Sequence, residues 1–339
     1  MLKYAFWNNK GGTGKTSLAF QTICQFARAN LDKRVLVIDM CPQANLSELL
    51  LGGLTKGGSQ QLMLRQGALP RATIGGYFQT RLTAVMSKPA FSFDDYLTEP
   101  FRVNGAIPKN ISLLCGDPLL ELQSNSMSTL ASTNIAGVNT WIAIMDWLKE
   151  FLEDANAEFD YVFFDLNPSF SIYTQVALAN ADRLIIPTMA DDSSRRAVQN
   201  AFSLVFGIKL PSPIYSEHNF SSRMLAAKRA LPKVHLVVQN RITQYMGPAS
   251  AYSAVLSQIT EAIKSLLHTY PQYFTFSELK DGILDIRDFQ TTGVVAFARG
   301  CPFDRVLPGY VQMPNKRVRV NRAQLDTCRN EIMEIVDTI

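Results

Sequence analysis

NNKGGTGKTS (residues 8–17) follows an aromatic, strand-like run, LKYAFW (2–7), and leads into SLAFQTICQFARAN (17–30), whose apolar residues recur with helical spacing. A strand, a glycine-rich loop and a helix in this order are the setting of a phosphate-binding loop. The glycines of the loop allow its backbone N–H groups to turn toward a phosphate, and the helix N-terminus adds the positive end of its dipole. The stretch therefore predicts a nucleotide-binding P-loop.

Two side chains of the loop have specific tasks in such a site. Lys15 can reach the β- and γ-phosphates, and Thr16 can offer its hydroxyl to Mg²⁺. The common pattern, G-x-x-x-x-G-K-S/T, has a glycine where this chain has Asn9, and Lys10 follows it. The candidate nucleotide-binding residues in this loop are Lys10, Gly11, Gly12, Thr13, Gly14, Lys15, Thr16 and Ser17.

Four further apolar runs predict the rest of the sheet. They are RVLVIDM (34–40), YVFFDL (161–166), RLIIPTM (183–189) and VHLVVQN (234–240). Continuous apolar runs are typical of strands that are buried on both faces, and helical patterns such as 138–153 and 249–268 lie between them. Buried strands that alternate with helices favour a doubly wound α/β fold with a mostly parallel sheet.

We interpret the chain, residues 1–339, as a single domain. Two regions have the composition of irregular structure: about 52–108 is rich in Gly, Pro and Gln, and 207–232 contains three prolines and a cluster of Lys and Arg. We expect both to be insertions that elaborate this domain.

Composition argues against a secreted or membrane-spanning protein. The N-terminus lacks the apolar stretch of a signal peptide, and no run approaches the ~18 apolar residues of a spanning helix. The five cysteines are widely scattered with no C-x-x-C pair, so we expect reduced thiols rather than zinc ligands. These features predict a cytoplasmic protein with no membrane partner.

The basic residues concentrate near the C-terminus, although the net charge of the chain is only +4. NKRVRVNR (315–322) can be a solvated basic turn before the last helix, or it can contact a phosphate backbone. The next segment, LDTCRNEIMEIVDTI (325–339), has the pattern of a docked helix. The candidate DNA-binding residues are Lys316, Arg317, Arg319 and Arg322.

The loop sequence K-G-G-T-G-K-T resembles the deviant Walker A motif of the ParA/MinD group of P-loop ATPases, and the chain is most similar to partition-type ParA proteins. In that family the early lysine, Lys10 here, reaches across a dimer to the nucleotide of the partner subunit. The resemblance implies ATP and Mg²⁺ as cofactors and a homodimer that forms when ATP binds.

The other motifs of this family follow in order. VLVIDMCPQANLS (35–47) resembles switch I, and FDYVFFDLNPSF (159–170) resembles the Walker B strand with switch II. Asp165 then takes the position of the magnesium-linked acid. An unpaired carboxylate at the end of a buried strand is costly unless a cation or hydrogen bonds hold it, and a magnesium site would meet that need. LVVQNRIT (236–243) is similar to the strand whose asparagine, Asn240 here, hydrogen-bonds adenine.

Position 41 departs from the family pattern. Aligned by the Pro-Gln pair that follows it, Cys41 falls where the family has the aspartate that positions the attacking water. A neutral thiol with a pKa near ~8.5 is a weak hydrogen-bond partner, and loss of a general base typically costs ~10²- to 10⁴-fold in rate. Asp39 can act through an extra water, or Asp191 or Asp192 can supply the acid, although these two are better explained as a helix N-cap.

The leading hypothesis is an ATP-binding partition or positioning switch. The resemblance implies a dimer that binds DNA non-specifically and works with a ParB-like or cargo adaptor protein to move a plasmid, chromosome or protein cargo. The catalytic candidates are Lys10, Lys15, Asp39 and Cys41, with Thr16 and Asp165 at the metal. The alternative is an ATP-stabilised, hydrolysis-deficient binding or scaffold protein, because the catalytic aspartate is replaced by Cys41.

Overall fold

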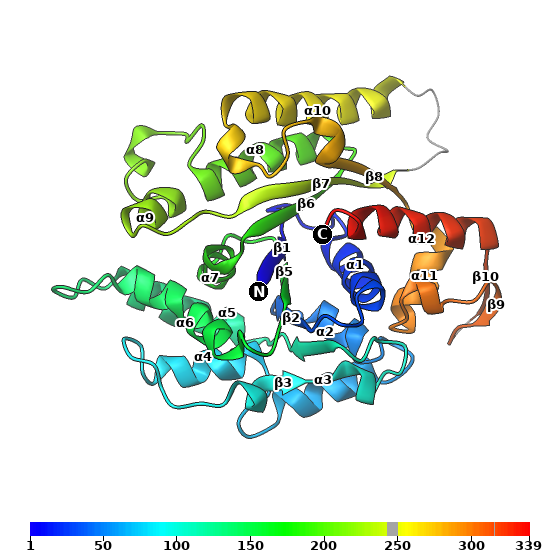
Figure 1. Ribbon diagram of the computed structural model, residues 1–339, viewed down its shortest axis with the longest axis horizontal. Helices are drawn as coiled ribbons and strands as arrows, with labels where there is room; N and C mark the ends of the chain where they lie inside the picture. Colours follow the sequence, from blue (N-terminus) through cyan, green and yellow to red (C-terminus); the bar gives the residue numbers. More distant parts are fainter. Residues whose placement is uncertain (243–249, 315) are drawn as a thin grey trace.

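The computed structural model describes residues 1–242, 250–314 and 316–339, in which a twisted sheet is covered by helices on both faces (Figure 1). Within these residues the main sheet has eight strands in the order β3-β4-β2-β5-β1-β6-β7-β8, and every neighbouring pair is parallel except β3 and β4. The strands are β1 (Leu2–Phe6), β2 (Val35–Met40), β3 (Leu97–Thr98), β4 (Ile111–Leu114), β5 (Tyr161–Leu166), β6 (Arg183–Met189), β7 (Lys233–Ile242) and β8 (Ile283–Arg287). The predicted doubly wound α/β fold is confirmed.

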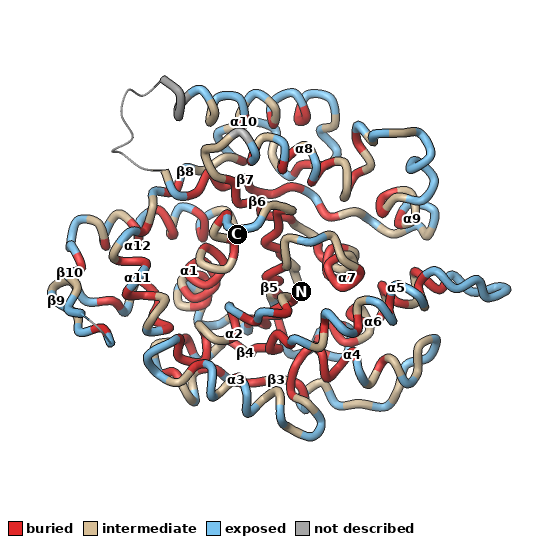
Figure 2. Tube along the Cα trace, turned by 180° about the vertical axis from the view of Figure 1, so that it is seen from behind, coloured by how far each residue is buried: buried red, intermediate tan, exposed pale blue. Residues whose placement is uncertain are grey.

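The continuous apolar runs are explained by a core on each face of the sheet. In β2, Leu36 and Ile38 belong to one core, while Val35 and Val37 belong to the other. Alternate side chains of a strand point to opposite faces, so both sets must be apolar when both faces are covered. Figure 2 shows the buried residues concentrated on the central strands and on the inward sides of the helices.

The helices divide between the two faces. One core includes α1 (Lys15–Ala29), α2 (Asn45–Leu50), α3 (Gly58–Gln66), α11 (Gln290–Ala298) and α12 (Arg322–Val336). The other includes α4 (Ile74–Leu82), α5 (Leu119–Ser132), α6 (Thr140–Ala155), α7 (Ile172–Asn180), α8 (Asp192–Phe206), α9 (Phe220–Ala226) and α10 (Ser250–Thr269). Short 3₁₀ turns lie at Phe93–Tyr96, Pro100–Arg102, Pro213–Tyr215, Pro271–Tyr273, Leu279–Asp281 and Phe303–Arg305. None of the described helices is long and apolar enough to cross a membrane.

Both predicted helices and the docked C-terminal helix are confirmed. α6 matches the pattern at 138–153 within two residues at each end. α10 matches the pattern at 249–268, although residue 249 itself lies outside the described residues. α12 buries Leu325 and Ile335 completely, as a docked helix requires.

The interpretation of 52–108 as irregular is wrong for much of its length. The region contains α3, α4 and the edge strand β3, and 207–232 contains α9. In α4, a Cβ added at Gly75 would lie 2.7 Å from the Asp117 Cβ, so this glycine permits close packing inside a helix rather than a turn. Glycine content alone therefore misled the prediction.

The basic segment near the C-terminus is a strand rather than a simple turn. β10 (Arg317–Val320) pairs antiparallel with β9 (Gly309–Gln312) to form a small second sheet. Arg317 and Arg319 are exposed while Val320 is buried, which is the alternation of a half-covered strand. We call this unit the basic hairpin; it lies beside α11 and α12 at one end of the molecule (Figure 1).

Candidate nucleotide-binding site

A cavity of about 360 Å³ opens where the parallel strands β1, β2 and β5 end. The carboxyl ends of parallel strands are the usual ligand site of a doubly wound sheet. Its walls come from the P-loop, from the segments that follow β2 and β5, and from Arg241 in β7. The lining residues are Gly11, Gly12, Gly14, Lys15, Thr16, Ser17, Cys41, Gln43, Asn45, Leu166, Asn167, Pro168 and Arg241.

The P-loop has the backbone that its glycines predict. Gly12 and Gly14 have φ angles of +76° and +78°, in the left-handed region that a side chain disfavours. Gly14 directly precedes α1, so the N-terminus of that helix points its N–H groups toward the cavity. The Lys15 ammonium donates to the carbonyl of Lys10 at 2.9 Å, and burial lowers its pKa against the opposing charge of Asp165. The Lys15 side chain therefore contacts the backbone of its own loop.

Thr16 and Asp165 meet as a magnesium site requires. The Thr16 hydroxyl donates to Asp165 Oδ2 at 2.7 Å, while the buried Asp165 Oδ1 has no hydrogen-bond partner among the described residues. Burial raises the pKa of Asp165 to about 7, with a further contribution from the charge of Asp39. A hydrated cation would supply the missing partner and offset both effects, so the residues present fit Mg²⁺.

Asp39 has a different environment, although it is directly opposite Asp165 in the register of β2 and β5. Its Oδ1 accepts from the Cys41 backbone N–H at 3.1 Å, and its Oδ2 accepts from both the backbone N–H and the hydroxyl of Ser47 at 2.8 Å. The side chain is fully buried, and this burial raises its pKa to about 6. Asp39 therefore braces switch I, and a catalytic role for it stays a prediction.

Cys41 lines the cavity at the position where the family has its catalytic aspartate. Burial, together with the negative charges of Asp39 and Asp165, raises the pKa of the thiol to about 12. The thiol is consequently protonated at neutral pH and cannot accept a proton from water. The geometry thus places a neutral, weakly polar group beside the phosphate-binding loop.

Lys10 contacts its own chain. Its ammonium forms an ion pair with Asp191 and donates to the Ser194 hydroxyl at 3.2 Å. Asp191 is the N-cap of α8, as expected, and accepts from the Ser194 N–H at 2.8 Å. Burial acts to raise the pKa of Asp191, but hydrogen bonds from Lys10, Ser193 and Ser194 lower it to about 2. The side chain of Asp192 lies outside the described part of the structure.

Asn240, in β7, supports the backbone of the P-loop by a hydrogen bond. Its side chain is buried, donates from Nδ2 to the Thr13 carbonyl at 2.9 Å and accepts at Oδ1 from the N–H of Arg241. A Cβ at Gly14 would lie 2.4 Å from Asn240 Nδ2, so a residue with a side chain at position 14 would clash with the Asn240 amide. The predicted adenine contact of Asn240 stays a prediction, and loop bracing is the role seen in this structure.

Several residues on the cavity wall or next to it were not predicted from the sequence. Gln43 and Asn45 lie within switch I, and the Asn45 side-chain amide donates to Gln43 Oε1 at 3.2 Å on the cavity wall. Trp7 is fully buried and donates from its indole N–H to the Asn167 carbonyl at 3.0 Å, which links β1 to switch II. Arg241 lines the cavity with a φ of +59°, and no local sequence signal marks that conformation.

The four candidate DNA-binding residues are brought together on or next to the basic hairpin. Lys316, Arg317 and Arg319 lie on it, and Arg322 begins α12. All four are exposed, and the Arg317 guanidinium lies over the Tyr310 ring at 4.6 Å. They form a surface that is separate from the nucleotide cavity.

Comparisons with known proteins identify the family of the chain. Residues 1–210 match a family model described as an AAA domain. Cell division protein PomZ of Myxococcus xanthus is 27% identical over 232 residues, which cover 67% of this chain and 60% of PomZ. A virulence plasmid ParA family protein of Chlamydia muridarum is 37% identical over 114 residues, which cover 32% of this chain and 39% of that protein. The chain therefore spans less than two thirds of either relative.

The solved structures extend the likeness over the whole fold. An ATP complex of McdA from Cyanothece aligns with a TM-score of 0.62 at 15% identity, covering 100% of this chain and 96% of that chain. At this identity the likeness is one of fold. The family match covers residues 1–210, which is more than half of the chain. The chain belongs to this family, and it is a P-loop ATPase of the ParA/MinD type.

Proposed function

We propose that this protein is an ATP-operated switch that partitions or positions a cargo. The observation that carries the proposal is a cavity lined by Lys15 and Thr16, in which the Thr16 hydroxyl donates to Asp165. The second Asp165 oxygen has no partner among the described residues and could hold a hydrated cation. The relatives named above, a cell division protein and a virulence plasmid protein, support a role in positioning.

Nucleotide binding uses the P-loop. Its backbone N–H groups and the ammonium of Lys15 hold the phosphates, and Thr16 with Asp165 holds Mg²⁺. When bound, the cation neutralises charge on the phosphates. Arg241, Gln43 and Asn45 line other parts of the cavity and offer polar contacts to the nucleotide.

Dimerisation would require Lys10 to exchange its ion-pair partner. In the single chain its ammonium is paired with Asp191, and in an ATP-bound dimer it would leave that carboxylate for the phosphates of the partner subunit. The pair is partly exposed, so breaking it costs little. The ATP-bound dimer would then bind DNA through the basic hairpin, associate with the nucleoid and meet a ParB-like or cargo adaptor protein.

Hydrolysis is the weakest step of this switch. A water oxygen must form a bond to the γ-phosphorus while the bond to the ADP oxygen breaks, and the water must lose a proton. The Cys41 thiol is protonated at neutral pH, because burial and two carboxylates raise its pKa to about 12. It therefore cannot accept the proton of the attacking water. This observation favours a second candidate function, a slow or non-hydrolysing ATP-held scaffold.

One experiment tests both functions. Steady-state phosphate release is measured for the wild type, Cys41→Asp and Lys15→Ala, with and without duplex DNA. Turnover by the wild type that is lost in Lys15→Ala supports a working partition ATPase, whereas turnover only in Cys41→Asp supports the ATP-held scaffold. Failure of the wild type to bind a fluorescent ATP analogue would refute both.

A matched control separates the chemistry of position 41 from its packing. Cys41→Ser has similar size and stays neutral, so it should release phosphate no faster than the wild type. A gain in Cys41→Ser equal to that in Cys41→Asp would mean that polarity, rather than a carboxylate, limits the wild type.

A further inference from the structure

Three exposed cations outside the basic hairpin gather around one buried thiol. Lys56 follows α2, Arg299 follows α11 and Arg305 lies in the 3₁₀ turn at Phe303–Arg305. Burial is the largest effect on the Cys301 thiol and raises its pKa, but all three cations are close enough to act against this. Residues far apart in the sequence thus form one surface, which we call the cation cluster.

The backbone that carries Lys56 and Arg299 is locked together. The N–H of Thr55 donates to the Ala298 carbonyl at 2.8 Å, and a Cβ at Gly53 would lie 2.5 Å from the Gly300 nitrogen. The buried Asn104 amide donates to the carbonyls of both Leu50 and Gly300, at 3.2 and 2.7 Å. The loop after α2 and the end of α11 are therefore packed together, which keeps the backbone of Lys56 close to that of Arg299.

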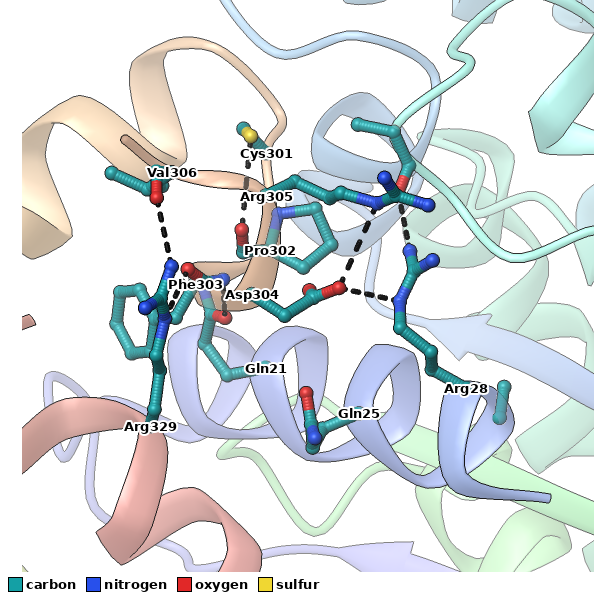
Figure 3. Close-up of polar contacts among 12 residues, drawn as sticks. Gln21, Gln25, Arg28, Cys301, Pro302, Phe303, Asp304, Arg305, Val306 and Arg329 are labelled. Carbon is teal, nitrogen blue, oxygen red and sulfur yellow. Dashed lines mark hydrogen bonds and ion pairs between the residues drawn. The ribbon is translucent and has the colours of Figure 1, made fainter. Parts of the chain in front are cut away.

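The segment that carries Arg305 is held on two sides, as Figure 3 shows. Gln21 of α1 accepts from the N–H of Phe303 at 2.8 Å, and Arg329 of α12 donates to the carbonyls of Phe303 and Val306 at 3.0 and 2.9 Å. A surface that is ordered before it binds loses little conformational entropy on association.

The charges of the cluster are poorly balanced within the protein. Lys56 and Arg299 make no ion pair with any residue that the structure describes. Asp304 lies 3.7 Å from Arg305, but it contacts Arg28 more closely, at 2.5 Å (Figure 3). Unpaired Lys and Arg side chains on one surface suit phosphate oxygens, which require positive charge and N–H donors.

We propose that Lys56, Arg299 and Arg305 form a second phosphate-contact surface for duplex DNA, distinct from the basic hairpin. The proposal rests on the proposed function, because it assigns further contacts to the DNA-bound form of the switch. It differs from that function in predicting that removal of the hairpin cations leaves part of the salt dependence in place.

The test measures the anisotropy of a fluorescein-labelled, random-sequence duplex with the full chain and Mg-ATP at several salt concentrations. Each lost phosphate contact reduces the magnitude of the negative slope of log K against log salt by ~0.9. The double variant Lys56→Gln/Arg299→Gln is therefore expected to make the slope less negative by about 1.8. The variant Arg317→Ala/Arg319→Ala reports the hairpin separately.

The control removes the same charge elsewhere. Lys228 and Lys233 are exposed, form no ion pair with described residues, and lie near α9 and the start of β7 (Figure 1). The variant Lys228→Gln/Lys233→Gln should keep the wild-type slope, and thermal melting should show all variants folded.

The outcomes separate the proposal from the function on which it rests. A slope that is less negative in Lys56→Gln/Arg299→Gln but not in the control supports the cluster. Equal slopes in wild type and Lys56→Gln/Arg299→Gln overturn the proposal, even if the hairpin variant binds DNA weakly. In that case an acidic protein would be the next partner to test for this surface. A wild type that binds ATP but no duplex overturns both the cluster and the DNA-binding part of the proposed function.

Discussion

The ends of β2 and β5 carry two aspartates that look equivalent and do different work. Asp39 and Asp165 are direct partners in the register, and 0% and 1% of their surfaces are exposed. Asp39 accepts three hydrogen bonds from Cys41 and Ser47, whereas Asp165 accepts one from Thr16 and keeps an oxygen with no partner among the described residues. Hydrogen-bond saturation thus distinguishes a bracing carboxylate from one that is ready for a cation.

This difference separates binding from turnover. On the β5 side, the P-loop, Thr16 and Asp165 have the arrangement that the proposed phosphate and magnesium site requires. On the β2 side, both oxygens of the Asp39 carboxylate accept hydrogen bonds from switch I. Cys41, from the same segment, lines the cavity. From this arrangement we expect nucleotide binding at the P-loop and a hydrolysis rate that depends on groups other than Cys41.

The largest effect is expected from removing the bracing carboxylate. Asp39→Ala leaves the donors of Cys41 and Ser47 without their acceptor, so the free energy of unfolding should fall by about 3 kcal/mol, even though a charge next to Asp165 is also removed. Urea denaturation measures this. Asp39→Asn keeps one acceptor oxygen and should lose less; equal stability of Asp39→Ala and wild type would contradict the bracing role.

The second effect tests the open carboxylate. Asp165→Asn keeps the shape of the side chain and removes its charge, so the magnesium-dependent part of ATP affinity should fall by ~10- to 100-fold. Calorimetric titration with magnesium and with EDTA separates this part from phosphate binding by the loop. The variant should bind ATP like the wild type in EDTA, and an unchanged response to magnesium would show that Asp165 is not linked to the metal.

The third effect is a pH dependence in the protein free of nucleotide and magnesium. Burial raises the pKa of Asp39 to about 6 and that of Asp165 to about 7, above the value near 4 in the unfolded chain. Between about pH 4 and 7 the native state therefore holds protons that the unfolded state releases. The free energy of unfolding should fall as pH rises through this window, by ~1.4 kcal/mol per pH unit for each proton.

Urea unfolding from pH 5 to pH 8 in EDTA measures this slope. Other titrating groups contribute as well, so the informative quantity is the difference between wild type and Asp165→Asn, which lacks one of the two acids. The variant should show the shallower decline. Identical pH profiles would mean that Asp165 is ionised throughout the window.

The smallest effect concerns the end of β6, where Asp191 holds Lys10. Asp191→Asn weakens an exposed ion pair worth ~1 kcal/mol or less, so the ATP concentration at half-maximal dimerisation should fall by about threefold. Sedimentation velocity across an ATP series measures this, with Ser193→Ala as a control that leaves the ion pair intact. A higher ATP requirement in Asp191→Asn would assign Asp191 to the dimer instead of the single chain.

Sequence predicted the features that depend on local pattern. The buried strands have continuous apolar runs because both faces are covered, and the P-loop is one contiguous motif. Features that depend on distant neighbours were missed or left open. The contact of Lys10 with Asp191, the bracing of Thr13 by Asn240 and the approach of Arg241 to the cavity join segments about 180 to 230 residues apart.

The indole of Trp7 gives the molecule a natural optical probe. Its N–H donates to the Asn167 carbonyl, next to Pro168 on the cavity wall, while Trp141 and Trp147 lie in α6 within the apolar core. Indole emission shifts when its hydrogen bonding or access to water changes. Movement of switch II is therefore expected to be visible in the intrinsic fluorescence of the unlabelled chain, with the α6 tryptophans as a constant background.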